Sequence, residues 1–261
     1  MKIIETLADW RTLRARLSGT VGFAPTMGAL HAGHMSLVAR SREQNDVTVA
    51  SIYVNPTQFD QPADLAAYPT PLDADLSSLR AQRVDYVLLP RYEDMYPDGF
   101  RFHVEETCFS RELCGAHRAG HFTGVLTIVM KLLNLVRPTR AYFGEKDYQQ
   151  FILVRDMAAT FFLDVEIVPC PIIREPDGLA LSSRNVRLDM AARRIAPELY
   201  RALRTESDDA AAVATLQAHG VDVDYVVSTM GRRFGAVRIR SGKDAVRLID
   251  NVPLGDVGVA T

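Results

Sequence analysis

The sequence predicts an α/β protein, with a doubly wound, Rossmann-like parallel sheet domain over residues 1–173 and a small α+β domain over residues 174–261. In the first part, short apolar runs alternate with segments of helical apolar spacing, which is typical of βαβ units in a parallel sheet. Polar turns containing glycine follow several of these runs, where open parallel sheets bind their ligands. The alternation ends near residue 173, which indicates that a second domain begins there.

The chain up to residue 89 is expected to form three strands and three helices. Residues 5–17 have the apolar spacing of a short amphipathic helix that leads into the first strand. The run from Thr20 to Ala24 predicts that strand, and the Pro-Thr-Met-Gly turn is expected to end it. The largely β-branched run from Asp46 to Val54 predicts a strand buried on both faces. The remaining elements are a helix over residues 33–42, a polar loop to Pro71, a helix over residues 72–82 and a strand over residues 85–89.

Beyond residue 90, a loop-rich stretch to residue 120 gives no assignment. Apolar residues at helical spacing then predict a helix from Phe122 to Val136, and Pro138 ends it. The first domain closes with a strand over residues 141–143, a helix over residues 148–162 and a strand over residues 165–173. The second is expected to hold helices over residues 191–204 and 208–219, the latter capped by Ser207, and strands over residues 225–228, 236–240 and 246–249.

Composition and charge restrict the function classes. Hydrophobic residues make up 48% of the 261, which permits a sizeable core. The formal net charge of −2 provides no basic surplus for binding a nucleic acid backbone. No apolar run approaches the roughly 18 residues of a membrane span, and the start lacks the apolar core of a signal peptide. The three cysteines lack metal-ligand spacing, so we expect reduced thiols, a cytoplasmic protein and no resident metal site.

The stretch from Gly28 to His34 carries the sharpest functional signal. A buried strand, a glycine-containing turn and a helix start place backbone N–H groups and a positive dipole end beside a bound anion. Without a following Lys-Ser/Thr the stretch is not a P-loop. His31 and His34 form a His-x-Gly-His sequence, the nucleotide-binding signature of one superfamily. The alternative is that these histidines only satisfy the turn.

Three further polar clusters follow predicted strands or lie at the domain junction, and we expect them to line one cleft with the histidines. Cations and hydroxyls beside a helix N-terminus suit the phosphates of a triphosphate, an acidic residue suits a ribose hydroxyl, and neutral glutamine amides suit a hydroxylated acid. Two alternatives stay open, a solvated loop charge for Lys146 and a simple helix cap for the serine pair. The clusters are Asn55 with Gln58, Lys146 with Asp147 and Gln150, and Ser182 with Ser183 and Arg184.

Four motifs in this order resemble the pantothenate synthetase (pantoate–β-alanine ligase) family. They are Pro25 to His34, Val54 to Phe59, Tyr142 to Gln150 and Asp177 to Asn185. The similarity extends from residue 1 to about residue 200 and resumes at residues 247–251. The first and last motifs also resemble paired signatures of class I aminoacyl-tRNA synthetases and nucleotidylyltransferases, the wider HIGH-motif nucleotidyltransferase superfamily.

The resemblance implies a two-step ligation. The carboxylate of (R)-pantoate attacks the α-phosphate of ATP, and pyrophosphate leaves with the help of Mg²⁺. The amine of β-alanine then attacks the acyl-adenylate and expels AMP. It also implies a C-terminal lid domain and a cytoplasmic homodimer that binds small molecules, with no nucleic acid or membrane partner.

Residue roles follow from the resemblance position by position. The catalytic proton donor corresponds to His34, assisted by His31 and Lys146. Pantoate contacts correspond to Gln58 and Gln150, and the β-alanine position to Gln58, with Asn55 and Tyr68 nearby. The expected ATP contacts are Met27, Gly28, Ala29, Leu30, His31, Ala32, Gly33, His34, Gly144, Glu145, Lys146, Asp147, Ile173, Leu181, Ser182, Ser183 and Arg184.

Three residues, two of them in the acid and amine region, and the length of the C-terminal domain depart from the family pattern. Asp60 stands where a glycine is usual, Thr70 and Thr123 stand where arginines are usual, and the C-terminal domain is shorter by about twenty residues, estimated from the usual family length. Two alternative functions therefore stay open: a paralogue that joins a different hydroxy acid to a different amine, and a nucleotidylyltransferase that stops at an adenylated product. The complete set of ATP motifs disfavours a non-catalytic binding protein.

Overall fold

The computed structural model describes residues 1–255 and divides into two compact units. Unit 1 comprises Met1–Glu145 and Gln149–Pro171, and unit 2 comprises Lys146–Tyr148 and the chain from Ile172 onward. That residues 1–173 and 174–261 fold as separate domains stays a prediction. Among the described residues, no helix is long and apolar enough to cross a membrane.

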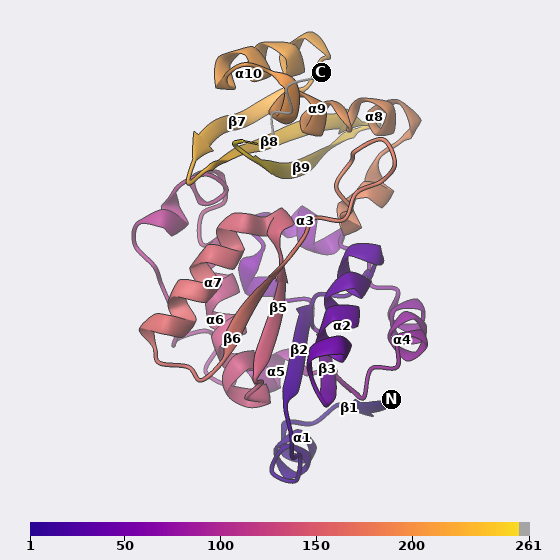
Figure 1. Ribbon diagram of the computed structural model, residues 1–261, viewed down its shortest axis with the longest axis vertical. Coiled ribbons are helices and arrows are strands. Elements are labelled where there is room, and N and C mark those ends of the chain that lie inside the picture. The colour runs from indigo at the N-terminus through magenta and orange to yellow at the C-terminus, as the bar shows by residue number, and fades with distance from the viewer. Residues whose placement is uncertain (256–261) are drawn as a thin grey trace. The chain divides into compact units, whose positions relative to one another are not determined.

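Unit 1 is built on a six-stranded sheet whose strands all run parallel (Figure 1). From β2 the chain proceeds through β3 and β4 on one side, whereas β5 and β6 lie on the other, so the sheet is doubly wound as predicted. The direction reverses between β2 and β5, which is the point where such sheets bind ligands. In spatial order the strands are β1 (Lys2–Ile4), β4 (Tyr86–Leu88), β3 (Val47–Ile52), β2 (Val21–Thr26), β5 (Arg140–Gly144) and β6 (Glu166–Cys170).

The helices predicted for unit 1 are present, but a further short helix, α3 (Pro62–Ala66), lies in the stretch predicted as a polar loop. Buried residues of α2 and α4 join those of the strands in one core that includes Val38, Leu79 and Tyr142. The most apolar helix, α6, buries residues along almost its whole length. The helices are α1 (Leu7–Arg14), α2 (Ala32–Gln44), α3 (Pro62–Ala66), α4 (Leu72–Ala81), α5 (Tyr92–Met95), α6 (His121–Val136) and α7 (Tyr148–Thr160), with 3₁₀ turns η1 (Pro56–Gln58), η2 (Phe109–Arg111), η3 (Gly115–His117) and η4 (Glu145–Asp147).

Two predictions for this unit were wrong in detail. The first strand is β1, which precedes α1 instead of following it. Its three residues are too few to show the alternation of apolar and polar residues that marks a strand, and they pair with β4, far along the chain. The strand β2 continues through Pro25 to Thr26 instead of ending at the turn. The Val21 carbonyl accepts a hydrogen bond from the β5 side of the strand, and alternate residues of a strand face the same side, so Pro25 also faces β5. The pairing of β2 with β5 ends at Phe23, so the N–H that Pro25 lacks has no partner to lose there.

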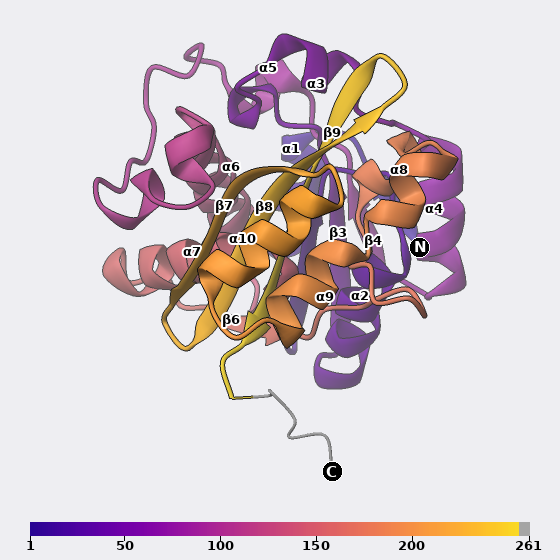
Figure 2. The same cartoon turned by 90° about the horizontal axis from the view of Figure 1, so that it is seen from above.

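Unit 2 contains a three-stranded antiparallel sheet, β7 (Asp222–Thr229), β8 (Arg232–Ser241) and β9 (Asp244–Pro253). Figure 2 shows α9 and α10 on one face of this sheet, and their core includes Leu203, Leu216 and Val237. Each strand extends beyond the range predicted for it. The other elements are α8 (Met190–Ile195), α9 (Glu198–Thr205), α10 (Asp209–Ala218) and the 3₁₀ turn η5 (Ser183–Arg187).

Two predictions for unit 2 were also wrong. The helix expected over residues 191–204 is the pair α8 and α9, because Pro197 has no N–H to continue the hydrogen-bond ladder of α8. The cap of α10 is Asp208 rather than Ser207. The Asp208 carboxylate accepts from Ala211 N at 2.8 Å, while the Ser207 hydroxyl donates to that carboxylate.

Candidate active site

The turn after β2 is held by the buried carboxylate of Asp75, which lies on helix α4. Gly28 and Ala29 both have left-handed backbones, with φ values of 82° and 49°. Asp75 of α4, only 2% exposed, accepts from Ala29 N at 2.8 Å and Leu30 N at 2.7 Å. A Cβ on Gly28 would lie 2.9 Å from the Asp75 carboxylate, so the glycine also allows this close approach. Sequence reasoning missed Asp75, because nothing near it in the chain marks its partner.

Replacing Asp75 with asparagine is expected to loosen this turn. One carboxylate oxygen becomes an NH₂ group facing a backbone N–H, so one hydrogen bond is lost and the free energy of unfolding falls by about 1–3 kcal/mol. Denaturant unfolding measures the change. Asp73→Asn, an exposed substitution in the first turn of the same helix, is the control. Equal stability of the two variants would contradict the role of Asp75.

His31 and His34 cap the first turn of α2 reciprocally. His31 Nδ1 accepts from Gly33 N at 3.1 Å, and His34 Nδ1 accepts from His31 N at 3.3 Å. Because each Nδ1 is an acceptor, the neutral form of each ring carries its proton on Nε2. The two rings lie 4.1 Å apart, centroid to centroid. Each Nδ1 therefore satisfies the turn, and the N–H donor of each neutral ring is at Nε2.

The first turn of α2 contains no acidic residue, so no carboxylate within the helix offsets the positive end of its dipole. This turn follows β2 directly, at the strand where the sheet changes direction. A backbone positive end and two ring N–H donors at this position form the elements of an anion site.

Asn55 and Gln58 form a second cluster in unit 1, joined to the first through Met27. Gln58 is 9% exposed, and its Nε2 lies 2.9 Å from the Met27 sulfur. Asn55 Nδ2 donates to Gln58 Oε1 at 3.1 Å and to the carbonyl of Gly124. Asn55 Oδ1 accepts from the hydroxyl of Tyr96, whose pKa is raised by burial, so that hydroxyl stays a donor. Asn55 thus orients Gln58.

A partly buried charge network contacts the backbone carbonyl of Gln58. Arg118 donates from Nε to Asp60 Oδ1 at 2.9 Å and from one guanidinium nitrogen to His121 Nε2. His121 Nδ1 then donates to the Gln58 carbonyl at 2.7 Å, since a carbonyl oxygen only accepts. Asp60, one of the departures, therefore neutralises a cation here. Of the other two, Thr70 is exposed, and the Thr123 carbonyl accepts from Thr127.

Two neighbouring glutamines of α7 differ in their surroundings. Gln149 is buried and its amide group binds the backbone of Phe109, Glu112 and Cys114, which is a structural role. Gln150 is half-buried and its side chain makes no hydrogen bond within residues 1–255. Tyr68, expected near the amine position, packs edge-on against Phe59 with ring centroids 5.6 Å apart.

The remaining predicted residues belong to unit 2, apart from Gly144, the last residue of β5, and Glu145, which follows it, both in unit 1. Lys146 Nζ lies 3.8 Å from Asp147 Oδ1, and the lysine side chain is 19% exposed. Leu181 N donates to the carbonyl of Ile173 at 3.0 Å, which brings these two together.

Ser182 caps η5 by accepting from Arg184 N at 3.2 Å, so the cap reading is confirmed for this serine. Among residues 1–255, no group of three His, Cys, Asp or Glu side chains is arranged to hold a metal ion.

The sequence of this chain matches a known protein family. The family model "Pantoate-beta-alanine ligase" matches residues 2–253. The Pantothenate synthetase of Bdellovibrio bacteriovorus is 50% identical over 253 residues, which cover 97% of this chain and 99% of that protein. That of Legionella pneumophila strain Lens is 48% identical over 253 residues, covering 96% and 99%.

Solved structures agree. Pantoate-beta-alanine ligase from Francisella tularensis, complexed with "Beta-gamma ATP" and β-alanine, has a TM-score of 0.92 at 39% identity, covering 97% of this chain and 98% of that one. Pantothenate synthetase from Thermus thermophilus has a TM-score of 0.86 at 40% identity, covering 97% and 99%. With the strand order and the His-x-Gly-His cap, these matches show that the chain belongs to the pantoate-β-alanine ligase family of enzymes.

Proposed function

We propose that this chain condenses (R)-pantoate with β-alanine at the expense of ATP, through a pantoyl-adenylate. The observation that carries the proposal is the reciprocal histidine cap on α2, at the strand where the sheet changes direction. Two ring N–H donors and a helix N-terminus suit the phosphates of ATP. The complex of the Francisella relative with an ATP analogue and β-alanine supports this choice of substrates.

The proposed chemistry proceeds in two displacements. A pantoate carboxylate oxygen attacks the α-phosphorus, the bond to the bridging oxygen breaks, and pyrophosphate leaves with that electron pair. The β-alanine nitrogen then attacks the acyl carbon, loses a proton and displaces AMP. Negative charge grows on phosphate oxygens in the first step, where the cation of Lys146 and the Nε2–H of His34 and His31 would stabilise it.

The ATP-binding set proposed from the sequence includes residues of both units. In unit 1 the turn Met27–His34 would face phosphate through its backbone and histidines. In unit 2 Lys146 and Arg184 supply cations, and Asp147 a carboxylate for a ribose hydroxyl. Mg²⁺ would arrive bound to the phosphates of ATP, as is usual for this ion, and is written as part of the substrate.

The acid site we propose is neutral. Gln58 and Gln150 offer amide groups that hold a hydroxyl and a carboxylate without pairing the attacking oxygen with a full positive charge, so that it stays nucleophilic. Gln150 supports this assignment because its amide is not used within the described residues, in contrast to Gln149. β-Alanine is placed beside Gln58, Asn55 and Tyr68.

Replacing Gln58 with alanine is expected to raise the KM for pantoate roughly tenfold or more, because a ligand hydrogen bond is lost. The affinity for ATP should change little, and the His121 bond to the residue 58 carbonyl persists because it uses the backbone. Steady-state kinetics with each substrate varied in turn measures the effect, with the exposed Gln217→Ala as control. Equal losses for pantoate and ATP would place the acid pocket elsewhere.

The two alternative functions, a paralogue that joins a different acid and amine and a nucleotidylyltransferase, are now less well supported. The chain matches the Bdellovibrio and Legionella proteins over nearly their whole length, so a short C-terminal part is shared with proteins named pantothenate synthetase. We also propose a homodimer and a cytoplasmic location, the latter because Cys108 and Cys170 form no disulfide within residues 1–255.

A further inference from the structure

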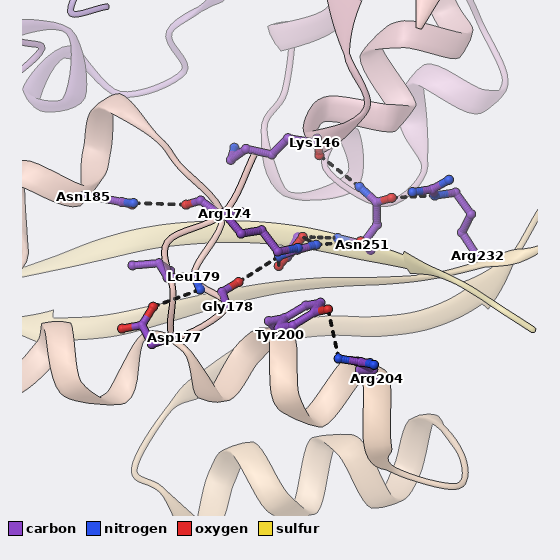
Figure 3. Close-up of polar contacts among 12 residues, drawn as sticks. Lys146, Arg174, Asp177, Gly178, Leu179, Asn185, Tyr200, Arg204, Arg232 and Asn251 are labelled. Carbon is purple, nitrogen blue, oxygen red and sulfur yellow. Dashed lines mark hydrogen bonds and ion pairs between the residues drawn. The ribbon is translucent and has the colours of Figure 1, made fainter. Parts of the chain in front are cut away.

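The segment that carries Lys146 is held by the antiparallel sheet of unit 2. Residues 146–148 count with that unit rather than with the strand β5 that precedes them. Asn251 of β9 donates from Nδ2 to the carbonyl of Lys146 at 3.1 Å (Figure 3). Arg232 of β8 lies over the ring of Tyr148, with its guanidinium carbon 4.4 Å from the ring centroid. Two strands therefore hold this short segment at both of its ends.

The amide of Asn251 has one possible orientation. Its Oδ1 accepts from Arg232 Nε at 2.6 Å, and a guanidinium only donates. Its Nδ2 must therefore point to the Lys146 carbonyl, which only accepts. Figure 3 shows the amide between these two partners. Because Asn251 is 1% exposed, water does not compete for either bond.

A buried ion pair fixes the backbone of β9 at this position. Asn251 N donates to Asp250 Oδ1 at 2.7 Å, and both Asp250 oxygens accept from Arg174, at 2.5 and 2.9 Å. The Arg174 guanidinium in turn lies 3.8 Å from the centroid of the Tyr200 ring. Burial raises the pKa of Asp250, while the nearby charges of Arg174 and Lys146 lower it, which places Lys146 within electrostatic reach.

The arrangement exceeds what the short 3₁₀ turn η4 needs to keep its fold. A carbonyl in contact with solvent is satisfied by water at little cost. The Lys146 carbonyl instead accepts from the buried amide of Asn251, whose oxygen and nitrogen are both held by partners. A lysine has four rotatable side-chain bonds, so its ammonium is placed precisely only if its backbone is fixed. The network fixes that backbone.

We propose that Asn251 and Arg232 are positioning residues for Lys146: they hold its backbone so that its ammonium meets the phosphates of ATP. This rests on the proposed role of Lys146 in binding ATP. Neither residue touches the substrate in this proposal, so both act only through the lysine.

The test is a double-mutant cycle on ATP affinity. Asn251→Asp keeps the shape and the bond from Arg232 but turns a carboxylate oxygen toward the Lys146 carbonyl. Arg232→Gln removes the guanidinium that orients the amide, at a half-buried position. Each is made alone and together with Lys146→Ala, and the dissociation constant for ATP is measured by titration calorimetry without pantoate.

Each single variant is expected to weaken ATP binding about threefold to tenfold, the equivalent of one hydrogen bond, and to have no further effect in the Lys146→Ala background. The KM for β-alanine should not change. Asp224→Asn is the matched control: it breaks the pairs with Arg238 and Arg247 in the same sheet, so it lowers the melting temperature but leaves ATP affinity unchanged.

The contradicting outcomes differ from one another. If Lys146→Ala weakens ATP binding but the Asn251 and Arg232 variants do not, the positioning role is wrong and the proposed function stands. If those variants weaken binding equally in both backgrounds, they act on ATP or on stability directly, which also overturns the positioning role. If Lys146→Ala itself leaves ATP affinity unchanged, the role of Lys146 is wrong and the positioning proposal falls with it.

Discussion

Replacing Lys146 with alanine is expected to abolish adenylate formation, by about a thousandfold or more, and to leave the fold unchanged. The rate falls because a cation aimed at charge that develops on phosphate oxygens is worth that much in a site shielded from water. The fold persists because the Asn251 bond uses the Lys146 carbonyl, which alanine retains. Among the described residues, the lysine ammonium forms an ion pair only with Asp147, whose side chain is 48% exposed, at 3.8 Å.

ATP–pyrophosphate exchange in the presence of pantoate measures this step without the amine. Lys243→Ala, in the exposed turn between β8 and β9, removes the same charge and serves as control. Exchange by Lys146→Ala near the wild-type rate, with a normal melting temperature, would refute the assignment of Lys146.

Replacing His34 with asparagine is expected to cost roughly a hundredfold to a thousandfold in the same exchange rate. The asparagine oxygen takes the place of Nδ1 and still accepts from His31 N, so the cap and the stability are kept. The donor at the Nε2 position is lost. Glutamine reaches that position with its own N–H₂, so His34→Gln should retain more activity than His34→Asn.

His117→Asn, an exposed substitution elsewhere in unit 1, controls for loss of an imidazole. The comparison separates the two nitrogens of the ring. If His34→Asn is folded and fully active, the Nε2–H of His34 has no part in the chemistry.

Local patterns were sufficient to predict most of the fold. Helices such as α6 and strands such as β3 are long enough for their apolar spacing to identify them, and alternation gave the doubly wound class. The elements that were predicted wrongly depend on residues far away in the sequence or on two local patterns that conflict. The strand β1 exists only through pairing with β4, and the apolar spacing that continues from α8 into α9 concealed the effect of Pro197.

The same distinction between local and distant signals applies to the residues of the site. The histidines and Gln58 lie in motifs whose local sequence marks them, and the structure joins Gln58 to Met27 across the sheet edge. The supporting residues have no such mark. Asp75 reaches its turn from α4, and Asn251 reaches Lys146 from the last strand, so in both cases the partners are far apart in sequence. Contacts of this kind depend on tertiary structure alone.

The central claim is tested most directly by following pyrophosphate and AMP released from purified protein with ATP, Mg²⁺ and (R)-pantoate, with and without β-alanine. We predict that pyrophosphate forms with the acid alone, as bound adenylate, and that AMP and pantothenate appear only when β-alanine is added. Adenylate without turnover on β-alanine would indicate a different amine. The absence of pyrophosphate with (R)-pantoate would contradict the proposed reaction.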